Sequence, residues 1–399
     1  MYPARRWCSA AGPWTLLGDR GVSVILYWLF GGWWAISAAI QLTSLVVPAR
    51  RPTPALGKDT QGVSVLVPVK GVDFELPANI EAFFRQSYPR LELIFAVADA
   101  NDRAIPAIEA AIADHPTVDA RLVIGGEEMA RNPKVANLMS AERWARYDLL
   151  LLSAANMAPA HDTIVRLISL LKSDIGVISS IPIAVRPTNF VGEIECATNN
   201  GYGARWLYTA QRLGTQATNG AATLVRRDSL RRGGGLAALA HSPCDDCELT
   251  LMMGKLGLRA ILAPEPILHP IGARTFREFW QRHRRWIHCR RHCLSWAVLV
   301  ECLLLNSIAP AIVGAMFWSN LLGASPVVVG STLLASFLLV EALFHVRMGW
   351  KLSWQAPAAW LARDVLLLLL WLDELVLRRR LVWRGTVIEV SKPTAPSTH

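Results

Sequence analysis

The stretch GVSVLVPV at residues 62–69 begins the part of the chain that decides its fold. It is a short, uncharged run rich in β-branched residues, which is typical of a strand buried on both faces of a sheet. A second run of this kind, LELIFAVAD, follows at 91–99, and a segment with helical spacing of apolar residues at 76–86 separates the two. Strands that alternate with helices predict a largely parallel α/β sheet with right-handed crossovers.

The same alternation continues to residue 183. Further strands are expected at 120–126, 147–154 and 175–183, and further helices at 104–116, 135–146 and 161–173. Sheets of this class bind ligands at the carboxyl ends of their strands. Lys70, Asp99 and the segment 153–156 each lie just after a predicted strand, so we expect them to line one crevice.

Composition indicates that part of the chain lies in lipid. Hydrophobic residues make up 52% and charged residues 18% of the 399 positions, whereas soluble proteins have about 25% charged residues. Residues 23–47 are uncharged and long enough for a spanning helix, since about 20 residues cross the hydrocarbon core. A cleaved signal peptide is the alternative, but the run is long and no clear A-x-A cleavage site follows it.

Three more apolar stretches follow, near 294–322, 326–346 and 356–377. Acidic and basic residues interrupt the last two of them. Ionisable side chains at membrane depth usually face protein or water. We therefore expect a packed helical cluster. The interrupting residues are Glu341, Arg363, Asp364, Asp373 and Glu374.

The formal charge of +10 fits either a nucleic-acid binder or a protein on anionic lipid. No zinc-finger spacing or RNA-recognition signature is present, and the basic residues concentrate beside apolar segments, so the membrane interpretation is favoured. The pair Cys244 and Cys247, and a group of His and Cys at 288–293, have residue types that suit zinc. We expect no zinc site. The two aspartates between the cysteines have a catalytic interpretation, given below, and the His and Cys residues at 288–293 lie in a basic segment that enters the membrane.

Two acidic groups are candidates for chemistry. Asp99 and Asp102 follow a predicted strand, where a carboxylate either accepts from a nucleotide or caps a turn. Asp245, Asp246 and Glu248 precede a helical pattern. They either complement the helix dipole or provide a general base, since neighbouring carboxylates raise one another's pKa.

The segment RTFREFWQRHRRW at 274–286 is basic and aromatic. On a helix its aromatic residues share one side and its arginines flank it, as in a helix that lies on a membrane surface; the alternative is a solvated charged face. Arg282 or Arg285 would suit a nucleotide diphosphate, which guanidinium groups bind in a bidentate manner.

Taken in order, these motifs resemble the bacterial-type ceramide glucosyltransferases of glycosyltransferase family 21. The resemblance runs from about residue 62 to residue 384. It is carried by VPVKGVD (67–73), VDARLVIGG (118–126), NPKVANLM (132–139), RRDSLRRGGGL (226–236), the aspartates 245–246, R-x-x-R-W (282–286) and WRG (383–385).

The resemblance implies an inverting transferase with a GT-A, Rossmann-like catalytic domain. It implies UDP-glucose as donor, a lipid such as ceramide as acceptor, and no nucleic-acid partner. It also implies a multi-pass protein of the bacterial inner membrane with a cytoplasmic catalytic domain. By residue, it implies Asp246 as the catalytic base. It places Lys70, Asp99, Asp102, Lys134 and Asn156 at the nucleotide sugar, and Asp245, Arg282, Arg285 and Trp286 at the acceptor and diphosphate.

One position departs from the family. The family carries an aspartate after the central strand that helps to hold a Mg²⁺ or Mn²⁺ ion, and here Ala154 stands there, with Asn156 two residues on. Alanine cannot coordinate a cation. A catalytically weakened binding protein therefore stays an alternative. Two further alternatives are transfer to another lipid such as a hopanoid and processive polysaccharide synthesis, although the few, charge-interrupted helices argue against a polysaccharide channel.

The expected organisation is a tail (1–22), a transmembrane helix (23–47), a linker (48–61), the catalytic domain (62–272), a basic interfacial helix (273–293), membrane helices (294–385) and a C-terminal tail (386–399).

Overall fold

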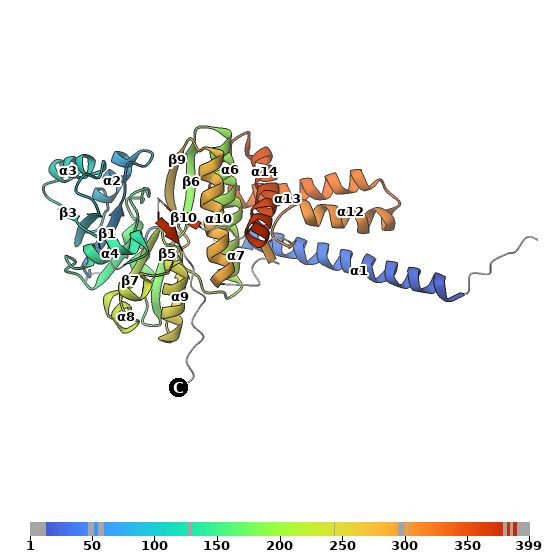
Figure 1. The fold of residues 1–399 in the computed structure, drawn as a ribbon, viewed down its shortest axis with the longest axis horizontal. Coiled ribbons are helices and arrows are strands. Elements are labelled where there is room, and N and C mark those ends of the chain that lie inside the picture. The colour runs from blue at the N-terminus through green and yellow to red at the C-terminus, as the bar shows by residue number, and fades with distance from the viewer. Residues whose placement is uncertain are drawn as a thin grey trace, which may run out of the picture.

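The computed structural model describes residues 13–46, 52–54, 60–126, 130–242, 244–293, 300–301, 303–377, 381–383 and 386–388. Most of the expected linker and C-terminal tail, the first part of the N-terminal tail, and positions 384–385 of the WRG match lie outside these residues. The chain forms a sheet domain from which apolar helices project in one direction (Figure 1).

A seven-stranded sheet forms the centre of the domain, in the order β3-β2-β1-β4-β7-β5-β8. Its strands are β1 (Val63–Val69), β2 (Leu91–Val97), β3 (Asp119–Ile124), β4 (Leu149–Leu152), β5 (Ile175–Ser180), β7 (Ala222–Arg226) and β8 (Arg259–Leu262). β1 pairs in parallel with β2 and β4, whereas β7 is antiparallel to both of its neighbours. The predicted, mostly parallel α/β sheet is confirmed, with β7 and β8 as strands that the sequence pattern did not indicate.

Both faces of the sheet are buried, which explains the continuous apolar runs. Val63, Val65, Val67 and Val69 of β1 join the core on one face, while Leu66 joins the core on the other. The first face is covered by α2 (Leu76–Phe84), α3 (Ile105–Asp114) and α5 (Thr163–Ser169), and the second by α4 (Pro133–Glu142), α8 (Arg227–Arg232), η3 (Leu236–Leu239) and α9 (Asp245–Lys255).

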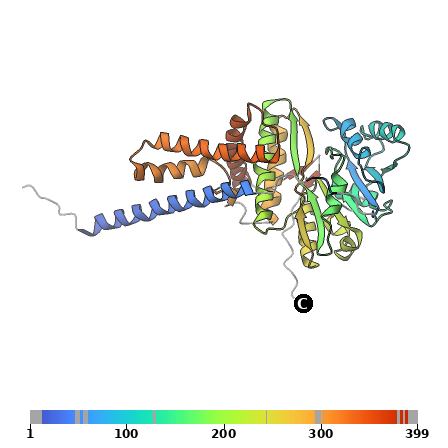
Figure 2. The same ribbon diagram turned by 180° about the vertical axis from the view of Figure 1, so that it is seen from behind.

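A second, two-stranded parallel sheet of β6 (Pro182–Pro187) and β9 (Ile267–Gly272) lies beside the first. An isolated bridge between Ala158 and Leu268 links β9 to the segment that follows β4. A continuous helical stretch made of α6 (Phe190–Cys196), η2 (Ala197–Ala204) and α7 (Arg205–Arg212) then lies between this sheet and the projecting helices (Figure 2). A short hairpin of β10 (Leu381–Trp383) and β11 (Thr386–Ile388) lies near the end of the chain.

The projecting helices are α1 (Pro13–Thr43), α12 (Ile308–Leu322) and α13 (Pro326–Met348), with η1 (Ser44–Val46) after α1. They run side by side away from the sheet domain in both views (Figures 1 and 2). Aromatic contacts join α1 to α12, with ring centroids of Tyr27 and Phe317 4.5 Å apart and those of Trp34 and Trp318 5.2 Å apart. Two segments, Tyr27–Val46 and Pro326–Met348, are long and apolar enough to cross a membrane, and α12 is apolar but shorter.

The acidic and basic residues that interrupt the last two apolar stretches are buried against protein, as predicted. Arg363 of α14 (Ala356–Leu372) contacts both oxygens of Glu341, at 2.6 and 3.1 Å, and lies 2.8 Å from Asp364. Arg205 of α7 lies 3.6 Å from Glu341, and all four side chains are at most 1% exposed. We call these four residues the buried ion cluster. Because removal of one partner from a buried pair costs about 3–5 kcal/mol, the cluster fixes α13 and α14 to the sheet domain.

The basic segment forms α10 (Phe276–Cys293), which packs between α6 and α14. Phe279 and His283 are buried, at 0% and 2% exposed, whereas Phe276 is 51% exposed. Asp373, in η4 (Asp373–Leu377), accepts a hydrogen bond from the Trp280 indole at 3.1 Å. Much of the aromatic side expected to rest on a membrane surface is therefore covered by the protein's own helices.

Candidate active site

The carboxyl ends of β1, β2 and β4 meet at one edge of the large sheet, where Lys70 and Asp99 are both exposed. The carboxylate of Asp102 accepts hydrogen bonds from the backbone N–H groups of Gly71, at 2.9 and 3.0 Å, and Ala104, at 2.9 Å. Gly71 has φ 67°, a conformation that favours glycine. Asp102 thus ties the loop after β1 to the loop after β2, while Asp99 keeps an exposed carboxylate beside them.

Helix α4 links this edge to the acidic group of α9. The Asn137 amide donates to the carbonyl oxygens that end β1 and β2, at 3.2 and 3.3 Å. Three residues earlier, and therefore on the same side of the helix, the Lys134 ammonium donates to Asp245 at 2.6 Å and to the Gly220 carbonyl at 2.9 Å. The side chain of Asn132 caps α4 by accepting from the N–H groups of Lys134 and Val135. The local sequence N-P-K thus fixes where Lys134 points.

Asp246 lies in the first turn of α9. Its Oδ1 accepts from the Cys247 N–H at 2.9 Å and from the Cys244 thiol at 3.4 Å. Burial and the neighbouring charge of Asp245 raise the pKa of Asp246, while the charge of Lys134 opposes the rise. A carboxylate with a raised pKa and no direct basic partner among the described residues suits proton abstraction.

A third group joins the end of β4 to α10. The Asn156 amide nitrogen lies 3.1 Å from Nε2 of His269 on β9. Burial and the nearby charges of Arg282 and Arg274 lower the pKa of His269 to about 3, so the imidazole is neutral at physiological pH. Arg282 in turn donates to the carboxylate of Glu195 at 3.1 Å. Asn156 and Arg282, which are far apart in sequence, therefore lie around one histidine.

Glu195 anchors the R-x-x-R-W segment and was not expected from the sequence. It is 0% exposed on α6, and its second oxygen lies 3.1 Å from Nε2 of His283. Burial alone would raise the pKa of Glu195, but His283 and Arg282 lower it well below its usual range. Arg285 is half-buried, and the ring of Trp286 makes an edge contact with His283 at 5.0 Å.

The three groups share one edge of the domain. The Ser153 hydroxyl at the end of β4 donates to the Ala221 carbonyl at 3.0 Å, next to the Gly220 carbonyl that Lys134 contacts. The loop at 219–221 thus joins the end of β4 to the acidic group. Asp99 lies at the same edge but takes no part in these contacts, because the hydrogen-bond partner of its carboxylate among the described residues is Asn101.

The residues at the end of β4 supply few ligands for a divalent cation. Ala154 is half-buried against the apolar core and supplies no ligand, and the carboxylate of Asp102 is engaged by backbone amides. Asn156 offers one amide oxygen and Asp99 one exposed carboxylate. These residues do not fit a magnesium or manganese ion held on paired carboxylates, which is how such ions are usually bound.

Another group of potential ligands lies in the first turn of α9. The ligand atoms of Cys244, Asp246 and Cys247 all lie within 4.8 Å of one another, the one such cluster in the described part of the chain. His288 of the second sequence group is held 2.7 Å from Glu374. The absence of a zinc site therefore remains a prediction. Zinc near one equivalent in purified protein would contradict it.

Comparisons with known proteins agree on a family. The family model for glycosyl transferase family 21 matches residues 29–395. Ceramide glucosyltransferase 1 of Caenorhabditis elegans is 28% identical over 252 residues, covering 63% of this chain and 53% of that protein. Ceramide glucosyltransferase 3 of the same organism is 24% identical over 337 residues, covering 83% and 73%. The chain thus spans about half the length of the first relative.

Among solved structures, the chain is similar to the mannosyltransferase PcManGT of Pyrobaculum calidifontis, in complex with GDP-Man and Mn²⁺. The TM-score is 0.48 and the identity 18%, over 91% of this chain and 97% of the other.

Proposed function

The chain belongs to glycosyl transferase family 21, and from that premise we propose that it transfers glucose from UDP-glucose to the hydroxyl of a membrane lipid such as ceramide, with inversion. The observation that carries the proposal is Asp246, a carboxylate with a raised pKa whose direct partners are a thiol and a backbone amide. It is linked through Asp245, Lys134 and α4 to the edge of the sheet where nucleotides bind in α/β folds.

Asp246 acts as the general base. Its carboxylate takes the proton of the acceptor hydroxyl as the oxygen attacks the anomeric carbon from the face opposite the diphosphate. The bond between that carbon and the diphosphate oxygen breaks, and UDP leaves. Lys134 pairs with Asp245, so that the acidic group does not carry two uncompensated charges beside the developing alkoxide.

Arg282 stabilises the departing diphosphate. One of its nitrogens is engaged by Glu195, and the side chain is 26% exposed, so other N–H groups of the guanidinium stay available for a phosphate oxygen. A guanidinium held in place by a buried carboxylate is a preorganised donor, which is the form of electrostatic stabilisation that lowers barriers most. The proposed mechanism uses no metal ion, because the residues at the end of β4 do not fit one.

The nucleotide lies at the edge formed by β1, β2 and β4. Asp99 accepts from the uracil, and Lys70 lies beside it, where it meets phosphate. Asp102 contributes by fixing the Gly71 backbone rather than by direct contact. Asn156 and Trp286 approach the sugar from the side of α10. Arg285, three residues after Arg282 and on the same side of the helix, extends the cationic surface.

The protein works at a membrane. Two segments are long and apolar enough to span a membrane. Helix α10 ties the sheet domain to the helical cluster formed by α1, α12, α13 and α14. We propose a multi-pass protein of the bacterial inner membrane, with the sheet domain on the cytoplasmic side, where UDP-glucose is made available.

The proposal is tested with membranes from a host that expresses the chain, incubated with UDP-glucose and ceramide and analysed by lipid mass spectrometry. A glucosylated lipid is expected, and Asp246→Asn should lower its rate by about 10²–10⁴-fold, the usual contribution of a general base. Glu248→Gln, an exposed carboxylate in the same helical turn, is the matched control and should keep the rate. The proposal fails if no UDP-sugar and lipid pair gives product while an established ceramide glucosyltransferase works alongside.

Ala154 favours a second candidate, a nucleotide- or lipid-binding protein with little turnover. Ala154→Asp restores a carboxylate at the end of β4. A large gain from almost no activity would support the binding protein, whereas an unchanged and substantial rate would reject it. Product analysis in the same membranes also distinguishes ceramide from a hopanoid acceptor, or from polysaccharide.

A further inference from the structure

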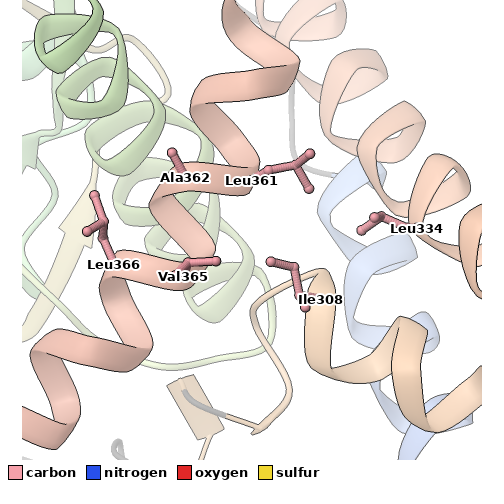
Figure 3. Close-up of a pocket in the computed structure, with 6 residues that line it drawn as sticks. All are labelled: Ile308, Leu334, Leu361, Ala362, Val365 and Leu366. Atoms are coloured by element: carbon pink, nitrogen blue, oxygen red, sulfur yellow. The ribbon is translucent and has the colours of Figure 1, made fainter.

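A hollow lies between α12, α13 and α14, on the side of the helical cluster nearest the sheet domain (Figure 3). Its volume is about 520 Å³, and it is an open hollow on the outside of the helices rather than an enclosed cavity. Every lining side chain is aliphatic. The lining residues are Ile308, Leu334, Leu361, Ala362, Val365 and Leu366.

We propose that this hollow holds a hydrocarbon tail of the lipid acceptor while its hydroxyl group lies at the site beside α10. The inference rests on the proposed function and adds to it a separate site for the tail.

The position of the hollow agrees with the reach of one lipid. Val365 lies eight residues before Asp373 in a continuous helical segment, which corresponds to about 12 Å along the axis. Asp373 contacts Trp280 at 3.1 Å and Arg284 at 3.3 Å, on the helix that carries Arg282. A hydrocarbon tail that fills one leaflet is about 15 Å long. Because α14 runs across the direction of α12 and α13 (Figure 1), the distance of about 12 Å corresponds to the length of a tail and not to depth in the bilayer. A lipid whose polar end lies at α10 therefore reaches the hollow with its tail.

The aliphatic lining of the hollow favours a hydrocarbon ligand. Arg363 and Asp364, on another side of α14, are buried and paired within the buried ion cluster, so they offer nothing to the hollow. Val365 is 47% exposed, and the other lining side chains are half-buried. A peptide or sugar placed here would leave its polar groups without partners, at a cost of several kcal/mol for each group. A hydrocarbon chain has no polar groups to leave unpaired, and it covers the exposed aliphatic side chains.

Two experiments test the tail site. In the first, Ala362→Trp fills the hollow, and Val365→Phe fills it from a more exposed position that tolerates substitution. Val328→Trp is the matched control, because Val328 is 63% exposed on α13 and does not line the hollow. Rates are measured at saturating UDP-glucose with a ceramide whose two chains are both long and with an analogue whose two chains both have six carbons.

The filled variants should raise the KM for the long-chain acceptor at least about 10-fold, equivalent to about 1.4 kcal/mol or the contact of roughly two methylenes. The KM values for the six-carbon acceptor and for UDP-glucose should change less than about 2-fold, because neither of them makes the contact that the filled variants remove. An equal change for both chain lengths, no change, or the same change in Val328→Trp would overturn the inference.

The second experiment needs no turnover. A long-chain ceramide with a photoreactive group near the end of its tail is cross-linked to the full chain in lipid nanodiscs, and labelled peptides are identified by mass spectrometry. Labelling should concentrate on 303–322, 326–348 and 356–372, fall in Ala362→Trp, and compete with unlabelled ceramide. Labelling elsewhere or without competition contradicts the tail site. Correct labelling without sugar transfer contradicts the proposed function alone.

Discussion

Replacing Glu195 by glutamine tests whether a single buried carboxylate holds the basic helix α10 in its working position. Glu195 is 0% exposed and lies 3.1 Å from both Arg282 and His283. Its pKa is lowered well below the usual range, against the effect of burial, so the side chain is charged at neutral pH. Glutamine keeps the shape and one acceptor oxygen but removes the charge.

The expected cost follows from this geometry. Removal of one partner from a buried pair costs about 3–5 kcal/mol, because the remaining charge stays buried. The side chain of His283 is 2% exposed and loses its carboxylate partner away from water, whereas Arg282 is 26% exposed and stays partly hydrated. We therefore expect a loss of about 3 kcal/mol in the free energy of unfolding. The released guanidinium of Arg282 should also raise the KM for UDP-glucose by about 10-fold, the equivalent of one charge-assisted hydrogen bond.

Thermal unfolding in detergent and donor saturation curves measure the two effects. Glu193→Gln is the matched control, since Glu193 is half-exposed on the same helix and makes no ion pair among the described residues. It should shift stability by no more than about 0.5 kcal/mol. If Glu195→Gln unfolds at the same temperature as Glu193→Gln and binds the donor as the wild type does, Glu195 does not hold α10.

Three further changes test other parts of the structure. Lys134→Met should raise the pKa of Asp246, because the ammonium lowers it, and should move the acid limb of the kcat/KM profile to higher pH; an unmoved limb contradicts Asp246 as the base. His269 has a pKa of about 3 when folded against about 6.5 unfolded, so its contribution is present above pH 6.5 and is lost as pH falls toward 3, with about 2 kcal/mol lost between pH 7 and 5. The unfolding temperature should therefore fall over that interval, less steeply in His269→Gln. Gly201→Ala places a methyl group against a buried carboxylate of α13 and should unfold well below Gly203→Ala, whose added carbon meets a neighbouring atom only at 3.4 Å.

Much of the central sheet was predictable from sequence, because its strands are buried on both faces. The runs at 62–69 and 91–99 become Val63–Val69 and Leu91–Val97, and each differs from the prediction by at most two residues. Such runs are typical of strands buried on both faces, and the polar residue inside each, Ser64 and Glu92, is hydrogen-bonded to the other at 2.5 Å. The edge at which Lys70 and Asp99 lie together followed from the same parallel order.

The antiparallel strand β7 and the small sheet were not predictable in this way. The five residues of β7 follow a turn, and their position between β4 and β5 depends on contacts with strands distant in sequence. Glu195 is a further case, because it meets Arg282 across 87 positions of the chain. A single glutamate on a short helix carries no motif, and it acquires its role only when α6 and α10 pack together. His269 is similar, since its contact with Asn156 spans 113 positions.

The partners of α10 support the proposed function, because they join the sheet domain to the apolar helices. On one side of the helix, Glu195 of the sheet domain compensates Arg282, and on another side Asp373, which follows α14, compensates Arg284 at 3.3 Å. Neither carboxylate is more than 8% exposed, so each contact is costly to break. A shift of the helical cluster relative to the sheet would have to separate one of these pairs. The R-x-x-R-W segment is therefore held at a fixed place between the edge proposed for the nucleotide and the apolar helices, which is where the proposed reaction requires the lipid hydroxyl to meet the donor.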